Sequence, residues 1–362
     1  MPATLLIVSL GELGTNVLEA AGRSGLFNRI VVASRSVDKA YARINNTLIG
    51  CGIDGFFPRF EAVGLDFNDP ACVATLRTLA PDIVFCAPTL LPWWKVGGLD
   101  GAAETPAEKV PFGGYVSLQL APMAIFRARM AEAGLAARWI AASFPDVINP
   151  SLARTGFAPD CGIGNVREPI AKIQVSLGRQ LGISPAQVEV RLVAQHAFEY
   201  GVFQPRPAAD LPPYLLDVTV NGQDRTEMGH AALREPFPFP YDLHFNRITA
   251  SAAIDGMRAL LSPSPVRTHL PGVLGLAGGY PVAVEAGHIH LDLPGQWSEA
   301  QAIATNEASL RWDGIASIEP DGTIVFTPET VDALHTLTGA TIEAAHPETA
   351  ASQAALILKH LA

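Results

Sequence analysis

Apolar and polar positions in the first part of the chain alternate between the period of a strand and the period of a helix. Short apolar runs predict strands at residues 5–9, 30–34, 61–65, 83–87 and 137–143. Amphipathic stretches between them predict helices at residues 15–24, 37–46, 69–79 and 115–133. Strands that alternate with helices through short links are typical of a parallel sheet covered on both faces, which is the doubly wound α/β fold.

The rest of the chain lacks this regular alternation. Its pattern predicts long helices at 166–181 and 246–261, strands at 188–194, 281–286 and 287–293, and closing helices at 327–336 and 347–361. Proline-rich segments at 204–214 and 236–240 predict ordered turns or edges. We therefore expect a Rossmann domain over 1–147, with a doubly wound parallel sheet, and an α+β domain over 148–362.

The turn after the first apolar run carries the clearest chemical signal. It consists of Gly11, Glu12, Leu13 and Gly14, and a helical pattern follows it directly. Glycines allow a tight turn and a close start of the helix, whose free N–H groups and partial positive charge attract a pyrophosphate. The usual first glycine of this fingerprint is Ser9, and Glu12 adds a negative charge. The turn predicts a dinucleotide site, although a purely structural strand–helix turn would also need these glycines.

The end of the second predicted strand indicates which dinucleotide is preferred. Ser34, Arg35 and Ser36 stand there, and no carboxylate follows until Asp38. A carboxylate at this place accepts hydrogen bonds from a ribose, whereas an arginine pairs with the 2′-phosphate of NADP. We expect NADP to be the cofactor, with NAD as the alternative. Arg35 as a solvated loop residue is the competing interpretation.

Other residues are expected along the same crevice because ligands of such sheets bind at the carboxyl ends of the strands. Asp66, Ala87 and Pro88 follow predicted strands and complete the set of expected cofactor contacts. Residues 88–115 form a long stretch with little periodicity, which is typical of a lid. Trp94 lies in this stretch and is a candidate substrate contact.

Composition limits the class of function. The chain has 362 residues, a formal net charge of −10 and 49% hydrophobic residues. An acidic protein of this kind is not expected to bind nucleic acid. The first apolar run is far too short to cross a membrane. Four cysteines without metal-ligand spacing favour buried free thiols in the cytoplasm, and no metal is expected.

The second half offers a candidate set for proton transfer. His196 follows an apolar strand, and Lys172 and Glu168 lie on the helix before that strand. A histidine can exchange a proton with a carbonyl or alcohol while a hydride moves to or from a cofactor. A carboxylate behind its ring, Glu168 or Glu199, would raise the imidazole pKa, and Lys172 would hold a substrate anion.

At these residues the chain resembles the lactate/malate dehydrogenase superfamily. The resemblance implies that family's two-part fold, a nicotinamide cofactor, His196 as the acid and base, Asn165 and Asn246 as substrate contacts, and a homodimer or homotetramer. It is carried by the runs 143–147, 161–165, 181–182 and 194–197, by the helix over 246–257, and by 272–275 with the strands that follow.

Four departures from the family pattern concern the substrate. Lys172 stands at the family's substrate-binding arginine, and Phe144 at an asparagine. The aspartate that orients the histidine falls on or beside Pro169, so Glu168 would have to replace it. The arginine of the family's mobile loop has no clear counterpart. The resemblance therefore implies fold, cofactor and His196 more strongly than a particular substrate.

The combined prediction is an NADP-preferring oxidoreductase that acts on a carbonyl or alcohol of a small polar substrate. Opine- or saccharopine-type reduction of imines or keto acids is an alternative, because the opening and the turn at 86–88 are similar to that group. A second alternative is an NAD-dependent glycosidase of the same superfamily, but Gly164 stands where those enzymes have a metal-binding cysteine. A non-catalytic NADP sensor is a third.

Overall fold

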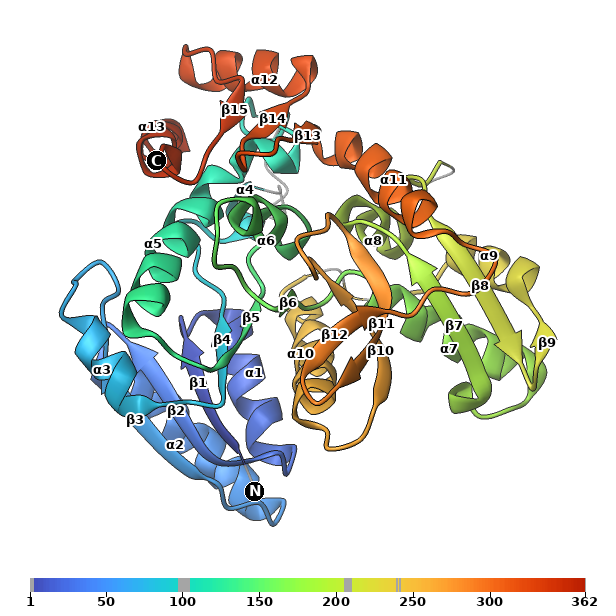
Figure 1. The fold of residues 1–362 in the computed structure, drawn as a ribbon, viewed down its shortest axis with the longest axis horizontal. Helices are drawn as coiled ribbons and strands as arrows, with labels where there is room; N and C mark the ends of the chain where they lie inside the picture. The colour runs from blue at the N-terminus through green and yellow to red at the C-terminus, as the bar shows by residue number, and fades with distance from the viewer. Residues whose placement is uncertain (1–2, 97–104, 205–209, 239, 241, 362) are drawn as a thin grey trace.

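The computed structural model describes residues 3–96, 105–204, 210–238, 240 and 242–361. Figure 1 shows a blue-to-green sheet region at the left, the red C-terminal elements above it, and the yellow and orange strands with their helices to its right.

A parallel sheet of six strands organises the first part of the chain, in the order β3-β2-β1-β4-β5-β6. Every neighbouring pair in this sheet runs parallel. This confirms the predicted doubly wound fold. The strands are β1 (Ala3–Val8), β2 (Phe27–Ser34), β3 (Arg59–Gly64), β4 (Ile83–Cys86), β5 (Arg138–Ala141) and β6 (Cys161–Gly162).

Helices cover both faces of the sheet because its side chains alternate between two apolar cores. Leu5, Ile7 and Ile30 belong to the core under α1 and α2, whereas Leu6 and Val31 belong to the core under α3 and α5. The helices of this part are α1 (Glu12–Arg23), α2 (Val37–Ile53), α3 (Cys72–Leu79), α4 (Trp93–Val96), α5 (Ser117–Ala133) and α6 (Pro145–Arg154), with the 3₁₀ helix η1 (Phe112–Tyr115).

The remaining strands form three small antiparallel sheets, which confirms the predicted α+β character. The strands are β7 (Val188–Val193), β8 (Leu215–Val220), β9 (Gln223–Asp224), β10 (Val266–Pro271), β11 (Gly279–Glu285), β12 (His288–Leu291), β13 (Ile315–Ile318), β14 (Ile324–Phe326) and β15 (Ala344–Ala345).

Helices pack on each of these sheets. Helix α7 (Arg167–Leu181) packs on β7, α10 (Phe245–Leu261) packs on β10 and on α1, and α13 (Ala350–Leu361) packs on α5. The others are α8 (His196–Phe203), α9 (Thr226–Arg234), α11 (Glu299–Ser309) and α12 (Pro328–Thr338), with the 3₁₀ helices η2 (Pro185–Gln187) and η3 (Leu310–Asp313).

The expected division at residue 147 does not match the packing. It falls inside α6, and the parallel sheet continues beyond it to β6. Side chains of the C-terminal elements, such as Ile324 and Leu334, share one apolar core with Phe126 and Trp139 of the first part. A cut at 147 would therefore split a helix, and the C-terminal end of the chain completes one core of the six-stranded parallel sheet.

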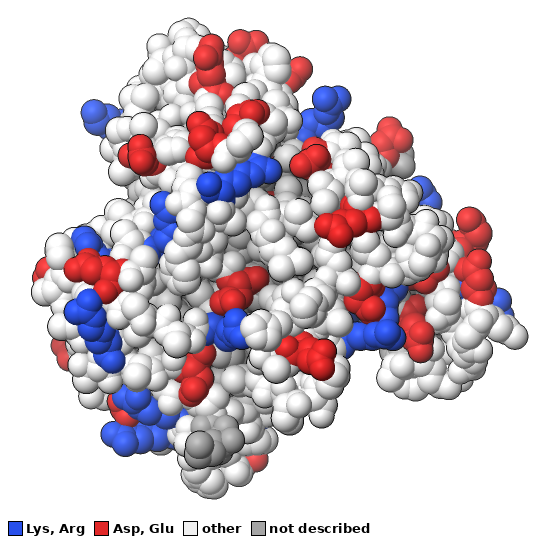
Figure 2. Space-filling view, in the orientation of Figure 1, with Lys and Arg blue, Asp and Glu red and all other residues white. Residues whose placement is uncertain are grey.

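The surface in Figure 2 carries acidic and basic side chains interspersed among uncharged ones on the face shown. Among the described residues, no helix combines the length and apolar character needed to span a membrane. All four cysteines are free and buried.

Candidate active site

The turn between β1 and α1 has the close packing that its glycines predict. A Cβ added to Gly14 would lie 2.3 Å from the backbone oxygen of Ser9, whereas one on Gly11 would meet nothing within 4 Å. Ser9 itself adopts a φ of 80°. The helix begins at Glu12 rather than at the predicted residue 15, and Gly11 caps it without any side-chain hydrogen bond. The start of α1 therefore has no side-chain cap, and an uncapped helix N-terminus can receive an anion.

The segment after β2 lies at the same edge of the sheet. The hydroxyl oxygen of Ser34 accepts a hydrogen bond from the N–H of Ser36, at 3.2 Å. Ser36 in turn caps α2 by accepting a hydrogen bond from the N–H of Lys39. The Arg35 side chain is exposed between these two serines. Each serine hydroxyl oxygen thus accepts a backbone hydrogen bond, and the exposed side chain belongs to Arg35.

The remaining predicted cofactor positions follow β3 and β4. Asp66 is exposed, and hydrogen bonds from Asn68 lower the pKa of its carboxyl, with a smaller contribution from the charge of Arg35. Ala87 and Pro88 come directly after β4, and the hydroxyl of Ser143 donates to the carbonyl of Pro88 at 2.7 Å. Because all these strands run parallel, the structure brings the predicted cofactor residues to one edge.

His196 begins α8 and is held by an aspartate that the sequence did not indicate. Its Nδ1 lies 3.0 Å and 3.1 Å from the two carboxylate oxygens of Asp313. The side-chain nitrogen of Gln195 also donates to Asp313, at 2.7 Å. The prediction that Glu168 orients His196 is therefore wrong. Asp313 ends η3, 117 residues away along the chain, and no local pattern links the two.

Two phenylalanines enclose the imidazole. The ring of Phe112 stacks on it at 4.6 Å with an interplanar angle of 23°, and Phe144 meets it edge-on at 4.9 Å. The side chain of His196 keeps 24% of its surface exposed. Since Nδ1 faces Asp313, Nε2 is the nitrogen that a ligand would meet.

The electrostatic surroundings of His196 favour its protonated form. Burial by itself disfavours the imidazolium, but the charge of Asp313, its hydrogen bond, and the charges of Asp146 and Glu168 outweigh burial and raise the pKa of His196. A histidine with a raised pKa keeps a proton available near neutral pH, as a general acid needs.

Asp146 is a second buried carboxyl near the histidine. Burial raises its pKa to about 7, and the charge of His196 opposes this rise. Asn165 donates a hydrogen bond to its Oδ2, while its Oδ1 has no partner among the described residues. The predicted substrate contact Asn165 therefore uses its amide nitrogen to hold Asp146.

Glu168 and Glu199 form a third acidic feature. Their exposed fractions are 5% and 6%, and burial raises the pKa of both carboxyls. The neighbouring charge of Glu168 raises the pKa of Glu199 further, so Glu199 keeps its proton to higher pH. The two carboxyls hydrogen-bond to each other, and Glu168 also has a hydrogen bond with Thr249.

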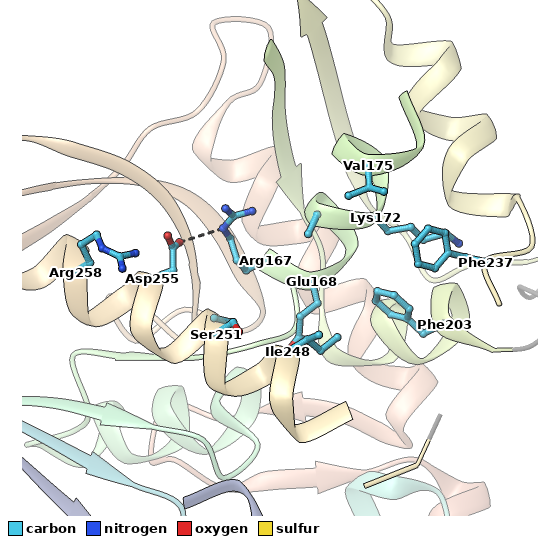
Figure 3. A pocket seen from close by; sticks show the side chains of 12 residues that line it. Arg167, Glu168, Lys172, Val175, Phe203, Phe237, Ile248, Ser251, Asp255 and Arg258 are labelled. Carbon is cyan, nitrogen blue, oxygen red and sulfur yellow. Dashed lines mark hydrogen bonds and ion pairs between the residues drawn. The ribbon is translucent and has the colours of Figure 1, made fainter. Parts of the chain in front are cut away.

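Lys172, which was predicted to hold a substrate anion, uses its ammonium for contacts within the protein. Its ammonium donates to the backbone carbonyls of Val202 and Leu233, at 3.1 Å and 3.0 Å, and lies 5.9 Å from the centre of the Phe237 ring. Desolvation lowers the pKa of Lys172 to about 8. Figure 3 shows its side chain running toward Phe237. The helix that was expected to supply a substrate-binding cation instead uses that cation to tie two backbone segments together.

The two other predicted substrate contacts are Asn246 and Trp94. Asn246 is buried in the first turn of α10, and its amide nitrogen has no partner among the described residues. Trp94 lies partly buried in the short helix α4, and part of the predicted lid, residues 97–104, lies outside the described residues.

A cavity of ≈ 340 Å³ opens beside this region, between α7 and α10. Figure 3 shows Glu168, Phe203 and Phe237 at its walls, with the ion pair of Arg167 and Asp255 at one end. Within the described ranges, no group of three or more histidine, cysteine, aspartate or glutamate side chains is arranged to hold a metal ion.

Comparison of the structure with solved proteins finds dehydrogenases. The malate dehydrogenase of Cryptosporidium parvum matches with a TM-score of 0.60 and 14% identity, over 86% of this chain and 96% of that chain. The malate dehydrogenase of Plasmodium falciparum matches with a TM-score of 0.59 and 11% identity, over 92% and 98%.

A third match is the lactate dehydrogenase of Cryptosporidium parvum, solved with lactic acid and nicotinamide adenine dinucleotide. Its TM-score is 0.57 at 12% identity, over 86% of this chain and 96% of that chain. No family model matches the sequence, and no curated protein matches it significantly. The chain therefore has the lactate/malate dehydrogenase fold, as the sequence predicted.

Proposed function

We propose that this protein is an oxidoreductase that moves a hydride between a nicotinamide dinucleotide, NADP in preference to NAD, and a carbonyl or alcohol of a small polar substrate. The observation that carries the proposal is the imidazole of His196, held by Asp313 at 3.0 Å and left with Nε2 available. An acid of this kind serves the carbonyl oxygen when a hydride arrives at the adjacent carbon.

The cofactor fits the residues present at the sheet edge. The uncapped start of α1 supplies backbone N–H groups, and the open space at Gly11 leaves room for a pyrophosphate. When bound, the nicotinamide ring would supply or accept the hydride. The chain's own residues bind, orient and exchange a proton.

The preference for NADP rests on Arg35. Its exposed guanidinium has the shape and charge to bind a phosphate, and Ser34 and Ser36 flank it in the sequence. A carboxylate at this position would instead suit the ribose hydroxyls of NAD.

The chain's contribution to the chemistry is a proton held at Nε2 of His196. Asp313 fixes the ring through Nδ1, and Phe112 and Phe144 exclude water from its flanks. In carbonyl reduction the imidazolium donates this proton to the oxygen, and in alcohol oxidation the neutral ring accepts it.

Nucleotide binding tests the proposal directly. NADPH and NADH are titrated against the protein, and nicotinamide fluorescence or titration calorimetry reports binding. We expect saturable binding of both, with NADPH tighter. Binding of neither nucleotide would overturn the proposal, and tighter binding of NADH would overturn the preference while leaving the oxidoreductase function standing.

We also propose that the protein works in the cytoplasm, for which its free buried thiols are the support, and that it forms a homodimer or homotetramer. Helix α2 and the turn after it expose an apolar series in which Ile53 is 81% and Phe57 83% exposed. Another copy of the chain would remove this surface from water. Light scattering on the wild type and on Ile53→Glu tests this: we expect an oligomer that the substitution dissociates, and a monomeric wild type would refute it.

A further inference from the structure

Gln195 is a fully buried amide that directly precedes His196 in the chain. Its side-chain nitrogen donates to Oδ2 of Asp313 at 2.7 Å. Its side-chain oxygen accepts a hydrogen bond from the backbone N–H of Ala197 at 3.0 Å. The amide therefore joins the first turn of α8 to the carboxylate that lies behind the histidine ring.

The two partners of Gln195 determine the orientation of its amide. The N–H of Ala197 needs an acceptor, whereas the carboxylate of Asp313 needs a donor. A flipped amide would place donor against donor at Ala197 and acceptor against acceptor at Asp313. Gln195 thus offers a hydrogen-bond donor to Asp313 in only one of its two orientations.

The backbone of Asp313 is held by close packing against η1. A Cβ added to Gly113 would lie 2.5 Å from the backbone oxygen of Asp313. This packing does not fix the carboxylate, because rotation about the terminal torsion of an aspartate is broad. Contact with His196 does not fix it either, since Nδ1 lies almost equally far from both oxygens, at 3.0 Å and 3.1 Å. The bond from Gln195 to Oδ2 is the contact that restricts this rotation.

The same bond also stabilises the charge of Asp313. The aspartate is 4% exposed, and a carboxylate in such a place needs hydrogen-bond donors. Among the described residues, its side chain has two partners, His196 and Gln195. The amide of Gln195 does not titrate, so it supplies its donor whether or not the imidazole is protonated.

We propose that Gln195 is a positioning residue of the proton transfer, which acts by holding the Asp313 carboxylate against Nδ1 of His196. The ring then keeps the orientation in which Nε2 is left for the substrate. This inference rests on the proposed oxidoreductase function and adds a residue to its proton-transfer machinery. Gln195 itself acts only through Asp313.

Gln195→Met tests the effect on turnover, because it keeps the length of the side chain and removes both polar ends. We expect kcat to fall about 10-fold, as for the loss of one hydrogen bond to a charged group. The KM for NADPH should not change, since Gln195 lies on the histidine side of the crevice. Gln301→Met, at the exposed start of α11, is the matched control and should behave like the wild type. A wild-type kcat in Gln195→Met would overturn the proposal.

The pKa of His196, measured by NMR titration of labelled histidine, gives a readout that needs no turnover. The charge and hydrogen bond of Asp313 raise this pKa, and the charges of Asp146 and Glu168 raise it further. In Gln195→Met the carboxylate is free to turn away from Nδ1, so we expect the pKa of His196 to be lower than in the wild type. An unchanged or higher pKa would contradict the positioning role.

A double variant tests whether Gln195 acts through Asp313. In an Asp313→Asn background there is no carboxylate to position, so adding Gln195→Met should change the pKa of His196 much less than it does in the wild type. Equal changes in the two backgrounds would show that Gln195 acts by another route, and they would overturn the inference.

The wild type provides a further measurement if Gln195→Met does not fold. When His196 becomes protonated it neutralises part of the charge on Asp313, which weakens the bond from the Gln195 amide. We therefore expect the NMR signal of the bonded amide proton to move downfield as the pH rises through the pKa of His196. An amide signal that ignores this titration would contradict the proposal.

The two proposals fail separately. Absence of NADPH binding refutes the oxidoreductase function, while the pKa measurements still show whether Gln195 holds Asp313 against the histidine. Binding of NADPH together with an unchanged pKa of His196 in Gln195→Met refutes only the role of Gln195.

Discussion

The two sides of the proposed crevice are built in opposite ways. The turn from Ser9 to Gly14 is a single continuous segment, and its shape comes from backbone geometry. The surroundings of His196 come from distant segments, with Phe112 in η1, Phe144 before α6 and Asp313 in η3. The first side can be inferred from adjacent residues. The second exists only once the chain has folded.

The two sides also differ in their cost to the folded state. The turn is exposed at Gly11 and Glu12, where water can satisfy backbone groups without a ligand. The histidine side buries carboxyls such as Asp146, whose pKa rises to about 7 because burial disfavours its charge. In the proposed function the turn is a general binder of phosphate, whereas the buried side chains serve one particular reaction.

Replacement of His196 tests the chemical side and should have the largest effect. We expect His196→Ala to lower turnover about 10²–10⁴-fold, since that is the usual contribution of a general acid or base. NADPH affinity should stay unchanged because the turn lies on the other side of the crevice. Steady-state kinetics and a fluorescence titration check both statements.

The control for this variant is His290→Ala, which alters an exposed histidine on β12. It should turn over like the wild type. Normal turnover by His196→Ala would show that His196 does not transfer the proton.

Asp313→Asn tests whether Asp313, although distant in sequence, controls the pKa of His196. The aspartate raises the pKa of His196, so its loss should lower that pKa and reduce turnover by roughly 10²-fold. Carbonyl reduction needs the imidazolium, and its rate falls as pH rises through the histidine pKa. The falling limb of the pH–rate profile should therefore move to lower pH in the variant.

Glu168→Gln provides the matched comparison for Asp313→Asn. Glu168 contributes a smaller charge effect at His196 and no bond to its ring. A larger shift of the pH profile in Glu168→Gln than in Asp313→Asn would reverse the assignment of the orienting carboxylate.

Arg35→Asp tests the nucleotide side. Loss of the guanidinium and gain of a carboxylate should weaken NADPH binding about 10–100-fold, as expected for charge-assisted hydrogen bonds, with a smaller effect on NADH. Arg43→Asp, on the exposed surface of α2, is the charge-matched control. Equal losses for the two nucleotides would mean that Arg35 does not recognise the 2′-phosphate.

Gly14→Ala tests whether the turn depends on the close approach of residue 14 to the backbone of Ser9. It should have the smallest effect. The new Cβ would approach the Ser9 carbonyl oxygen to 2.3 Å, so β1 and α1 must separate. We expect a loss of about 1–3 kcal/mol in the free energy of unfolding, measured by urea denaturation. Gly11→Ala, which meets nothing within 4 Å, should lose less stability, and the opposite order would contradict this account of the turn.

The sequence-based predictions that the structure corrects concern the residues expected to act with His196. Glu168 lies on the predicted helix at a plausible spacing from His196, yet the partner is Asp313. Lys172 has the right charge, but the packing of α8 and α9 turns its ammonium to the carbonyls of Val202 and Leu233. Side-chain direction depends on what the helix packs against, and one sequence does not state that.

The sequence by itself determined the parallel sheet, the glycine turn, the serine and arginine after β2, and the position of His196 at the end of β7. These follow from the periods of apolar residues and from backbone rules that act over a few residues. Only the tertiary structure decided that Asp313 supports the imidazole and that the last elements complete the first core. Such contacts join residues more than a hundred positions apart, and burial selects them through packing rather than through any local pattern.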